Sequence, residues 1–342
     1  MSPTTNMKTF NNLYPQLISF ENLYKAAVEA ARGKRAKTDV ADFLLNIEKE
    51  LFKIKEELEV GNYQPGGYKT FMVKEYCKKR EISAASFRDR VVHHAFCQIV
   101  EPIFDKTFIF HSFACRVGKG THAAIKVAER YLRQNKYVFQ GDITKYFKNI
   151  NHEVLLSILM RKIHDEKIIN LARLIVFSWN KNSGKGVPIG NLTSQFFANL
   201  YLNELDYFIK FQLRQRYYLR YMDDFVLFGK NKKELWALQE KIGKFLTKKL
   251  VLSLHGKKST VYPCGNGVPF LGFHIFYKYR RLKNANLIRF MQKIHKFKKD
   301  FLDNKIELED LMGKIRCWIN HSVFGDTYCL RKNIFSRLIL NK

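Results

Sequence analysis

The chain has 342 residues, 46% of them apolar, with 29 Phe and 17 Tyr. This composition provides for a packed core and excludes an intrinsically disordered chain. Its 60 Lys and Arg outnumber 31 Asp and Glu. The resulting net charge of +29 indicates a polyanionic partner, with nucleic acid as the first candidate and an anionic membrane surface as the second.

The N-terminal stretch MSPTTNMKTF lacks the basic start and the apolar run of a secretory signal. The sequence has no apolar run of about 18 residues that would predict a transmembrane helix. Its six cysteines are scattered and form no CxxC pair, which favours free thiols in a reducing compartment. We therefore expect a cytoplasmic protein with no membrane partner.

The first predicted elements are helices followed by a hairpin. Residues 17 to 60 have helical spacing, and Gly61 can cap the last helix. The segment KTFMVKEY is strand-like, and the basic cluster KEYCKKREI could form a hairpin that presents Lys78, Lys79 and Arg80 to phosphates. Taken alone, such a cluster is more often a solvated turn.

The next segment, SFRDRVVHHAFCQIVEPIF, has the spacing of a helix that ends at Pro102. His93 and His94 would face different ways on this helix, so they do not predict a metal site. The loop RVGKGTHAAI opens a further helix and matches a phosphate-binding loop only loosely.

A strand over residues 137–139 is expected to end near Asp142, before a helix that Asn151 caps. A Gly/Pro loop leads into a long helix from about Thr193. The segments YYLRYM and FVLFG have the pattern of two strands joined by a two-residue turn, Asp223–Asp224. A basic helix over 232–250, a hairpin in GVPFLGFHIFYKYRRL and a basic helical region from about 285 follow. This mixture without strict alternation predicts an α+β fold.

The adjacent aspartates carry the strongest chemical signal. If the strand that ends in Asp142 is a neighbour of the Asp223–Asp224 turn, three carboxylates converge at one sheet edge. Carboxylates converge at low cost only around a cation, and oxygen ligands suit Mg²⁺ with a phosphate substrate. Two such ions about 3.5–4 Å apart would serve phosphoryl transfer. Taken singly, Asp223–Asp224 is more often a turn signal and Asp142 a helix cap.

Together, these segments resemble the sequence blocks of reverse transcriptases. QGDITKYFKNI, GVPIGNLTSQFFANLYL, YMDDFVLF and LHGKKSTVYPCGNGVPFLGFHI resemble the palm blocks, and REISAASFRDRVVHHAF resembles the fingers block of the group II intron branch. The resemblance covers about residues 60 to 280. It implies a right-hand polymerase architecture with fingers, an antiparallel-sheet palm and a helical thumb. The implied domains are an N-terminal helical extension (1–60), fingers and palm (61–280) and thumb (281–342).

The block before the long helix indicates which branch of the family the chain resembles. Most such enzymes read Gln-Gly-x-x-x-Ser-Pro where this chain has Ile189, Gly190, Ser194 and Gln195. This form resembles reverse transcriptases of diversity-generating retroelements, which copy a template-repeat RNA into cDNA with errors at adenines to diversify a target gene. The segment after the palm is short for a maturase region or a ribonuclease H domain, and no Val-Thr-Gly signature of retrons is found in it. The alternatives are another group II-like, CRISPR-associated or abortive-infection reverse transcriptase, or an inactive basic RNA-binding scaffold.

The resemblance also implies roles for single residues in catalysis. Asp142 and Asp223 would bind two Mg²⁺ ions, for which Mn²⁺ could substitute, with Asp224 and the backbone carbonyl of Ile143 as further ligands. Lys258, or its neighbour Lys257, would neutralise the leaving pyrophosphate. The nucleotide would be bound by a further set: Lys78 or Lys79 with Arg80 on the triphosphate, Phe147 against a ribose 2′-hydroxyl unless it is a core residue, and Ile189, Gly190 and Gln195.

The implied nucleic-acid contacts lie further along the chain. Phe270, Leu271 and Gly272, with Phe273, would form the primer grip. Lys293, Lys296, Lys298 and Lys299 would contact phosphates of the template–primer duplex, whereas Trp318 is assigned to the core. The implied partners are template RNA, the RNA/cDNA hybrid, dNTPs and a small helical accessory protein that forms a basic ring.

Overall fold

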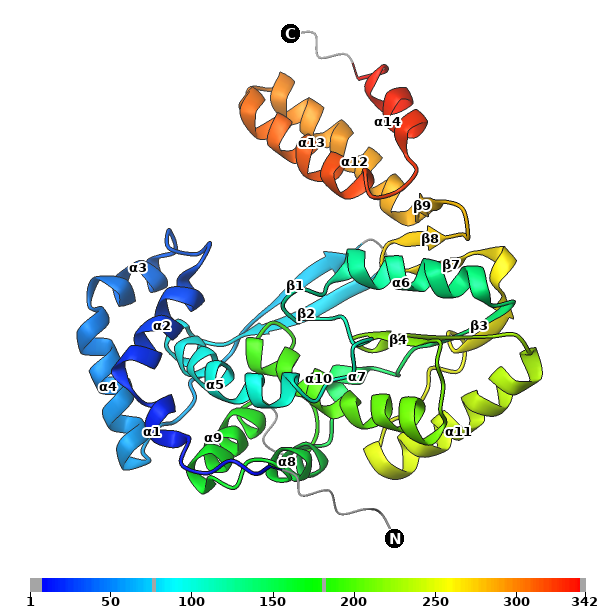
Figure 1. The fold of residues 1–342 in the computed structure, drawn as a ribbon. Helices are drawn as coiled ribbons and strands as arrows, with labels where there is room; N and C mark the ends of the chain where they lie inside the picture. The colour runs from blue at the N-terminus through cyan, green and yellow to red at the C-terminus, as the bar shows by residue number, and fades with distance from the viewer. Residues whose placement is uncertain (1–7, 76–77, 180–182, 339–342) are drawn as a thin grey trace.

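The structure, a computed structural model, describes residues 8–75, 78–179 and 183–338 (Figure 1). Helices and small antiparallel sheets are mixed along the chain, in agreement with the predicted α+β class. None of the helices in these ranges combines the length and the apolar character needed to cross a membrane. The division into domains at residues 60 and 280 stays a prediction.

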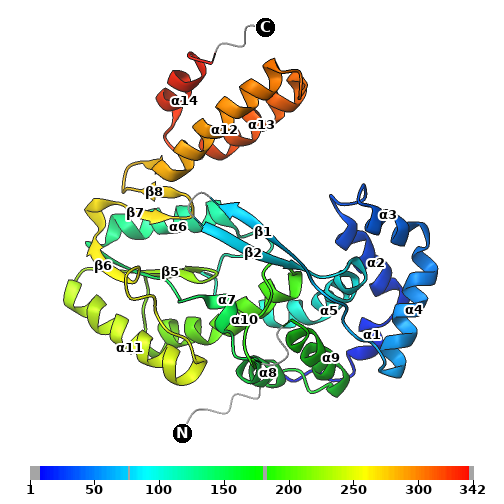
Figure 2. The same cartoon turned by 180° about the vertical axis from the view of Figure 1, so that it is seen from behind.

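The N-terminal helices lie on one side of the molecule in both views (Figures 1 and 2). The hydroxyl of Ser19 caps the second of them by accepting a hydrogen bond from Asn22 N at 3.3 Å. The last ends at Gly61, whose φ of 82° is the left-handed conformation that favours glycine, as predicted. The four are α1 (Tyr14–Leu17), α2 (Phe20–Ala31), α3 (Thr38–Leu45) and α4 (Ile47–Val60).

The predicted hairpin is formed by β1 (Lys69–Glu75) and β2 (Lys78–Ala84), which pair antiparallel. The next helix, α5 (Phe87–Asp105), packs against α2. It does not end at Pro102 as predicted but continues through it to Asp105. Only one more turn follows the proline, so the lost backbone hydrogen bond is confined to the helix end.

The central sheet has the strand order β4-β5-β3-β6, and every pair in it is antiparallel. Side chains of β5 alternate between two cores: Phe225 and Leu227 belong to the larger one, Val226 and Phe228 to a second. The strands are β3 (Tyr137–Gly141), β4 (Tyr218–Tyr221), β5 (Asp224–Gly229) and β6 (Thr260–Pro263).

Helices cover the two faces of this sheet, with α6 on one side and α10 and α11 on the other (Figures 1 and 2). The predicted cap of α8 is confirmed, because the Asn151 side chain accepts a hydrogen bond from Val154 N at 3.0 Å. The helices are α6 (Thr121–Gln134), α7 (Tyr146–Asn149), α8 (His152–Met160), α9 (Glu166–Phe177), α10 (Leu192–Tyr207), a π-helix (Phe208–Gln212) and α11 (Lys232–Leu250).

The C-terminal part begins with a three-stranded antiparallel sheet, where a hairpin was predicted. Its strands are β7 (Val268–Phe270), β8 (Phe273–Ile275) and β9 (Arg280–Leu282). The third strand forms because Arg280 and Leu282 pair with β8. Three helices follow and share a separate core, in which Trp318 stacks on Phe290 at 3.8 Å between ring centroids. These are α12 (Asn284–Leu302), α13 (Leu308–Ser322) and α14 (Tyr328–Phe335).

Candidate active site

The three predicted aspartates lie at the same end of two neighbouring strands. β3 pairs with β5, and Gly141 lies opposite Phe225. One more step in this register places Asp142 across from Asp224, so both belong to the sheet face of Val138 and Val226. The prediction that the strand ending in Asp142 neighbours the strand of the aspartate turn is confirmed.

The turn between β4 and β5 is shifted by one residue from the prediction. Tyr221 pairs with Asp224, so the turn consists of Met222 and Asp223 rather than Asp223 and Asp224. Met222 has a φ of 57°, an unusual value for a residue with a Cβ. Asp224 is the first residue of β5, and its backbone belongs to the ladder.

Glycine is required directly before Asp142. A Cβ at Gly141 would overlap the ring of Phe225, which crosses β3 at this point. The absence of a side chain therefore lets the two strands pack closely beneath the carboxylates.

The pKa values of Asp223 and Asp224 are raised at this sheet edge. Burial raises the pKa of Asp223, and the charge of Asp142 raises it further. Burial also raises the pKa of Asp224 to about 6, with Asp223 and Asp142 as additional causes. A cation between these groups would reverse both effects, because an opposite charge favours the ionised form.

Basic side chains from three parts of the chain act on this cluster. Lys258 Nζ donates to Asp142 Oδ2 in an ion pair. The charges of Arg80 on β2 and of Lys258 lower the pKa of Asp223. Lys283, just before α12, has the same effect on the pKa of Asp224. Of the two lysines between which the sequence left a choice, Lys258 is the one that pairs with an aspartate.

The described residues contain no group of three Asp, Glu, His or Cys side chains close enough to form a ready metal cage. The three carboxylates therefore share one sheet edge without converging on a single point. Asp142 is paired with Lys258, and successive side chains at Asp223 and Asp224 diverge. The donor set still fits Mg²⁺, which is usually held by one or two carboxylates together with water and substrate phosphates.

The loop before α10 is fastened to β2. Ser83 N donates to the carbonyl of Ile189 at 3.0 Å. The Asn191 side chain accepts from Ala85 N at 3.2 Å and donates to the carbonyl of Ser83 at 3.3 Å. Gly190 between them has a φ of 123°, and a Cβ there would lie 2.9 Å from Ile82 Cγ2. This loop therefore has a fixed position against the hairpin.

Other predicted nucleotide contacts are placed differently. Phe147 on α7 is half-buried and packs against the main core, so both its predicted role and the core alternative retain support. Gln195 is exposed and lines a pocket of about 430 Å³ together with Glu101, Cys115 and Arg116. The side chains of Lys78 and Lys79 lie outside the described part of the structure.

The predicted primer grip is a tight turn between β7 and β8. Phe270 is only 1% exposed and its side chain belongs to the second core, so its part in a primer grip stays a prediction. Leu271 and Gly272 form the turn, with φ values of 47° and 90°. The carbonyl of Gly272 accepts hydrogen bonds from Lys283 N at 3.0 Å and Asn286 Nδ2 at 3.2 Å, which join the turn to α12.

The predicted thumb lysines all lie on α12. Lys293, Lys296 and Lys299 are exposed, whereas Lys298 is half-buried. The buried residues of the same helix, Phe290 and Ile294, face the third core. α12 therefore has a basic, solvent-facing side.

Two residues that the sequence reasoning missed lie beneath the turn. Arg220 and Asp206 are both 0% exposed and form an ion pair at 2.7 Å. An arginine inside the otherwise apolar and aromatic run before the aspartates was the signal that could have identified them.

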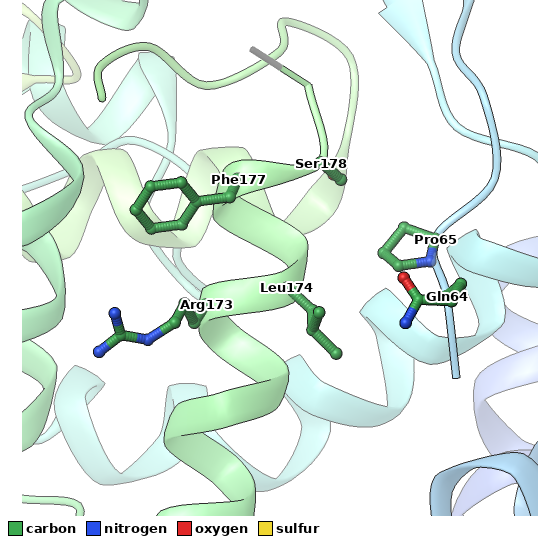
Figure 3. A pocket seen from close by; sticks show the side chains of 6 residues that line it. All are labelled: Gln64, Pro65, Arg173, Leu174, Phe177 and Ser178. Atoms are coloured by element: carbon green, nitrogen blue, oxygen red, sulfur yellow. The ribbon is translucent and has the colours of Figure 1, made fainter. Parts of the chain in front are cut away.

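A pocket of about 340 Å³ lies apart from these residues, between α9 and the segment before β1 (Figure 3). Figure 3 shows Leu174 on the side of the helix toward Pro65 and Gln64, with Arg173 and Phe177 directed elsewhere. None of its lining residues was predicted as part of a site.

Comparisons with known proteins agree with this geometry. The family described as "Reverse transcriptase (RNA-dependent DNA polymerase)" matches residues 73–275. Protein YkfC of Escherichia coli is 26% identical over 287 residues, which cover 70% of this chain and 74% of YkfC. Group II intron-encoded protein LtrA of Lactococcus lactis is 25% identical over an alignment that covers 91% of this chain and 63% of LtrA.

The chain thus spans less than two thirds of LtrA. Nuclear intron maturase 2 of Arabidopsis thaliana matches a shorter part, with 30% identity over 106 residues, 29% of this chain and 14% of the maturase. The family match covers more than half of the chain and includes all three aspartates. The chain therefore belongs to the reverse transcriptase family and is an RNA-directed DNA polymerase.

Proposed function

We propose that this reverse transcriptase polymerises DNA at a two-metal site built on Asp142, Asp223 and Asp224, and that it serves a diversity-generating retroelement. The observation that carries the first part is the sheet edge where Asp223 and Asp224 have raised pKa values amid Arg80, Lys258 and Lys283. Buried carboxylates with raised pKa values, close to basic side chains, suit the binding of cations and phosphates.

The backbone next to Asp142 supports the proposed role of Ile143. The carbonyl of Asp142 accepts from His255 N at 2.8 Å, and Thr144 N donates to the carbonyl of Ser253 at 2.9 Å. Hydrogen bonds alternate in direction along an antiparallel pair. The carbonyl of Ile143 therefore faces away from Leu254, toward the side on which β5 and the Asp223 turn lie. It is thereby available as an oxygen ligand.

When bound, two Mg²⁺ ions would stabilise the attacking 3′-hydroxyl oxygen and the leaving pyrophosphate oxygen. Asp142 and Asp223 would hold them, and Asp224 would add negative charge nearby. Lys258, which pairs with Asp142 in the structure, would neutralise the pyrophosphate. Arg80 on β2 would hold the triphosphate, and the predicted help of Lys78 or Lys79 falls on side chains outside the described residues. Phe147 limits the space beside the sugar.

The second part of the proposal rests on the loop block, where Ile189 and Gln195 replace the more usual Gln and Pro. On this basis, the enzyme copies a template-repeat RNA into cDNA with errors at adenines. A small helical protein that forms a basic ring is the proposed accessory partner, with structured RNA between the two basic surfaces. The similarity to LtrA across 91% of the chain favours a group II-like reverse transcriptase as the second candidate.

The test is the sequencing of cDNA made by the purified enzyme from an RNA of balanced base composition. The retroelement assignment expects substitutions concentrated opposite template adenine. A group II-like enzyme with ordinary fidelity would give low errors at all four template bases and would overturn this assignment while leaving polymerase activity intact. A template repeat with a variable copy next to the coding sequence is the matching genomic observation.

A further inference from the structure

Arg220 is buried beneath the aspartate turn with every one of its N–H groups engaged. Nε donates to Asp206 Oδ1 at 2.8 Å, and Nη2 donates to Asp206 Oδ2 at 2.7 Å. The remaining donors reach Ser112 Oγ at 3.0 Å, Asn199 Oδ1 at 3.2 Å and the carbonyl of Met222 at 3.0 Å. A guanidinium has five N–H donors, so this buried cation is fully satisfied.

Stability alone does not explain this arrangement. A buried ion pair is often replaced by apolar residues of similar volume without loss of stability, because both charges must be dehydrated. Asp206 and Arg220 are each 0% exposed, so both carry that desolvation cost in full. The acceptors of the Arg220 hydrogen bonds therefore indicate what the ion pair does.

One target is the strained residue of the turn. Met222 has a φ of 57°, a conformation that costs a side-chain-bearing residue on the order of 1–3 kcal/mol and persists only where surrounding contacts fix it. Arg220 Nη1 donates a hydrogen bond to the carbonyl of Met222. The contact fixes the backbone one residue before Asp223 and two before Asp224.

The other targets tie the turn to rigid elements. Asp206 and Asn199 both lie on α10. The hydroxyl of Tyr218, two residues before Arg220, also donates to Asp206 Oδ1, at 2.6 Å. Ser112 lies in a segment that adds to the edge of β4: Arg220 N donates to the carbonyl of His111 at 2.9 Å, and Phe113 N donates to the carbonyl of Arg220 at 3.0 Å.

The sheet register places this network and the reactive carboxylates on opposite faces. Arg220 lies opposite Phe225 and shares its face, toward α10. Asp224, the preceding residue of β5, belongs to the other face together with Asp142. The Arg220–Asp206 pair therefore contacts the turn from the α10 face of the sheet and leaves the face of Asp142 and Asp224 free for substrate.

We propose that Arg220 and Asp206 are positioning residues that fix the Met222–Asp223 turn, so that the aspartate carboxylates are held ready for metal ions. The proposal rests on the two-metal site proposed above. It assigns no contact with substrate to either residue. Its prediction is a specific loss of metal binding and turnover when the pair is removed from an otherwise folded protein.

The main test is the full-length double variant Arg220→Met with Asp206→Leu, which exchanges the pair for apolar side chains of similar size. We expect a thermal unfolding midpoint close to that of the wild type and a kcat lowered by about 10²-fold, the cost of a misplacement of about 1 Å. Mn²⁺ binding, measured by the loss of the free-ion electron paramagnetic resonance signal in the presence of a template–primer duplex, should weaken at least tenfold. The KM for dNTP should change far less.

The single variant Arg220→Lys covers the case in which the double variant does not fold. Lysine keeps a positive charge beside Asp206 but lacks the planar fork that reaches both Asp206 and Met222. It should lower kcat and weaken Mn²⁺ binding in the same way. The matched control is Arg161→Gln with Glu204→Gln, which removes a 2.8 Å ion pair involving α10 that is partly exposed, and should leave all three readouts unchanged.

Asp223→Asn, measured in parallel, separates the two proposals. If Asp223→Asn synthesises DNA normally, the two-metal site itself is wrong. If Asp223→Asn is inactive while a folded Arg220 variant has normal kcat and normal Mn²⁺ binding, only the positioning role is overturned. If a folded Arg220 variant loses kcat but binds Mn²⁺ normally, the turn is not held for metal and the proposal also fails.

Discussion

The N-terminal helices and the rest of the chain differ in charge. Residues 1–60 contain nine Lys and Arg and nine Asp and Glu, so the entire net charge of +29 belongs to residues 61–342. The neutral part instead packs α2 onto α5 through a buried face that includes Ala26, Ala27 and Ala30. The electrostatic footprint for nucleic acid therefore coincides with the part of the chain that holds the aspartates, the hairpin and α12.

The largest effect is expected from a substitution in the aspartate cluster, which belongs to the basic part of the chain. We expect Asp223→Asn to lower the rate of primer extension on an RNA template by at least 10³-fold, because one oxygen ligand and one charge are lost. Burial raises the pKa of Asp223, so its ionised form opposes folding above that pKa. The variant should therefore be as stable as the wild type at pH 7, or slightly more stable.

The matched control for this substitution is Asp326→Asn, at an exposed position in the loop before α14. Asp326 Oδ2 accepts a hydrogen bond from Arg280 N at 2.7 Å, so this carboxylate belongs to the C-terminal part and not to the aspartate cluster. Thermal unfolding and primer extension are measured on both variants. Wild-type synthesis by Asp223→Asn would contradict the metal assignment.

Salt dependence tests the charge comparison directly. Binding to a template–primer duplex should weaken steeply with salt, by roughly 10³–10⁵ between 50 and 200 mM if six to ten phosphates are contacted. Replacing Lys293, Lys296 and Lys299 on α12 by Gln should lower the slope of log K against log salt by about one unit per lost contact. Fluorescence anisotropy over a salt series measures this slope.

Three lysines of the neutral part serve as the comparison. Lys25, Lys49 and Lys53 are exposed on α2 and α4, and their replacement by Gln removes the same charge. We expect their triple variant to keep the wild-type slope. Equal slopes for the two triple variants would show that total charge, and not its placement on α12, controls binding.

Much of this organisation was predictable because its signals are local. Gly61 ends α4, Asn151 caps α8, and α11 covers Lys232–Leu250 as expected, since caps and helical spacing depend on neighbours in sequence. The aspartates were also predictable, because their chemistry is unusual for a strand segment. The resemblance to reverse transcriptase blocks, in the same order, also predicted that strands distant in sequence lie together in one sheet.

The missed features depend on tertiary contacts. The turn is shifted by one residue because cross-strand packing sets the register: Leu219 pairs with Val226, and both face the second core. Arg220 would look the same in sequence on a solvent-facing strand, and its partner Asp206 lies 14 residues away on another element. The burial of Phe270 likewise follows from its packing into the second core.

The stability of the folded chain should respond to pH through His93 on α5. Burial lowers the pKa of His93 to about 4, and neither ring nitrogen has a hydrogen-bond partner among the described residues. The unfolded chain, with a histidine pKa near 6.5, then binds more protons than the folded one as pH falls from about 6.5 to about 4. Stability is present above this window and is lost within it, by ~2 kcal/mol between pH 7 and pH 5.

His93→Leu should remove this dependence, whereas His295→Gln, at an exposed site on α12, should retain it. Urea unfolding at pH 7 and pH 5 gives the two free energies for each protein. A pH response in His93→Leu as large as that of the wild type would exclude this histidine as its source.

The smallest expected effect concerns fidelity at the loop before α10, which is hydrogen-bonded to the β1–β2 hairpin. Ile189 is half-buried, and its carbonyl accepts a hydrogen bond from Ser83 N, so its backbone is held beside β2. A glutamine there could donate and accept hydrogen bonds, whereas isoleucine offers only an apolar wall. Discrimination by shape alone is limited to about 1–3 kcal/mol. A templating adenine, with its two-bond pair to thymine, should be the base most affected by the missing support.

Ile189→Gln should therefore lower misincorporation opposite template adenine by a few-fold to about tenfold, within the free-energy range that such a contact supplies. Ile189→Leu keeps an apolar wall and should keep the wild-type error pattern. The measurement is deep sequencing of cDNA made by the three proteins from one RNA template at equal extents of synthesis. Because the loop contacts the hairpin and not the aspartates, the Mg²⁺ concentration for half-maximal activity should be the same in all three. Equal adenine error rates in the three pools would show that Ile189 does not set fidelity, although the polymerase assignment would stand.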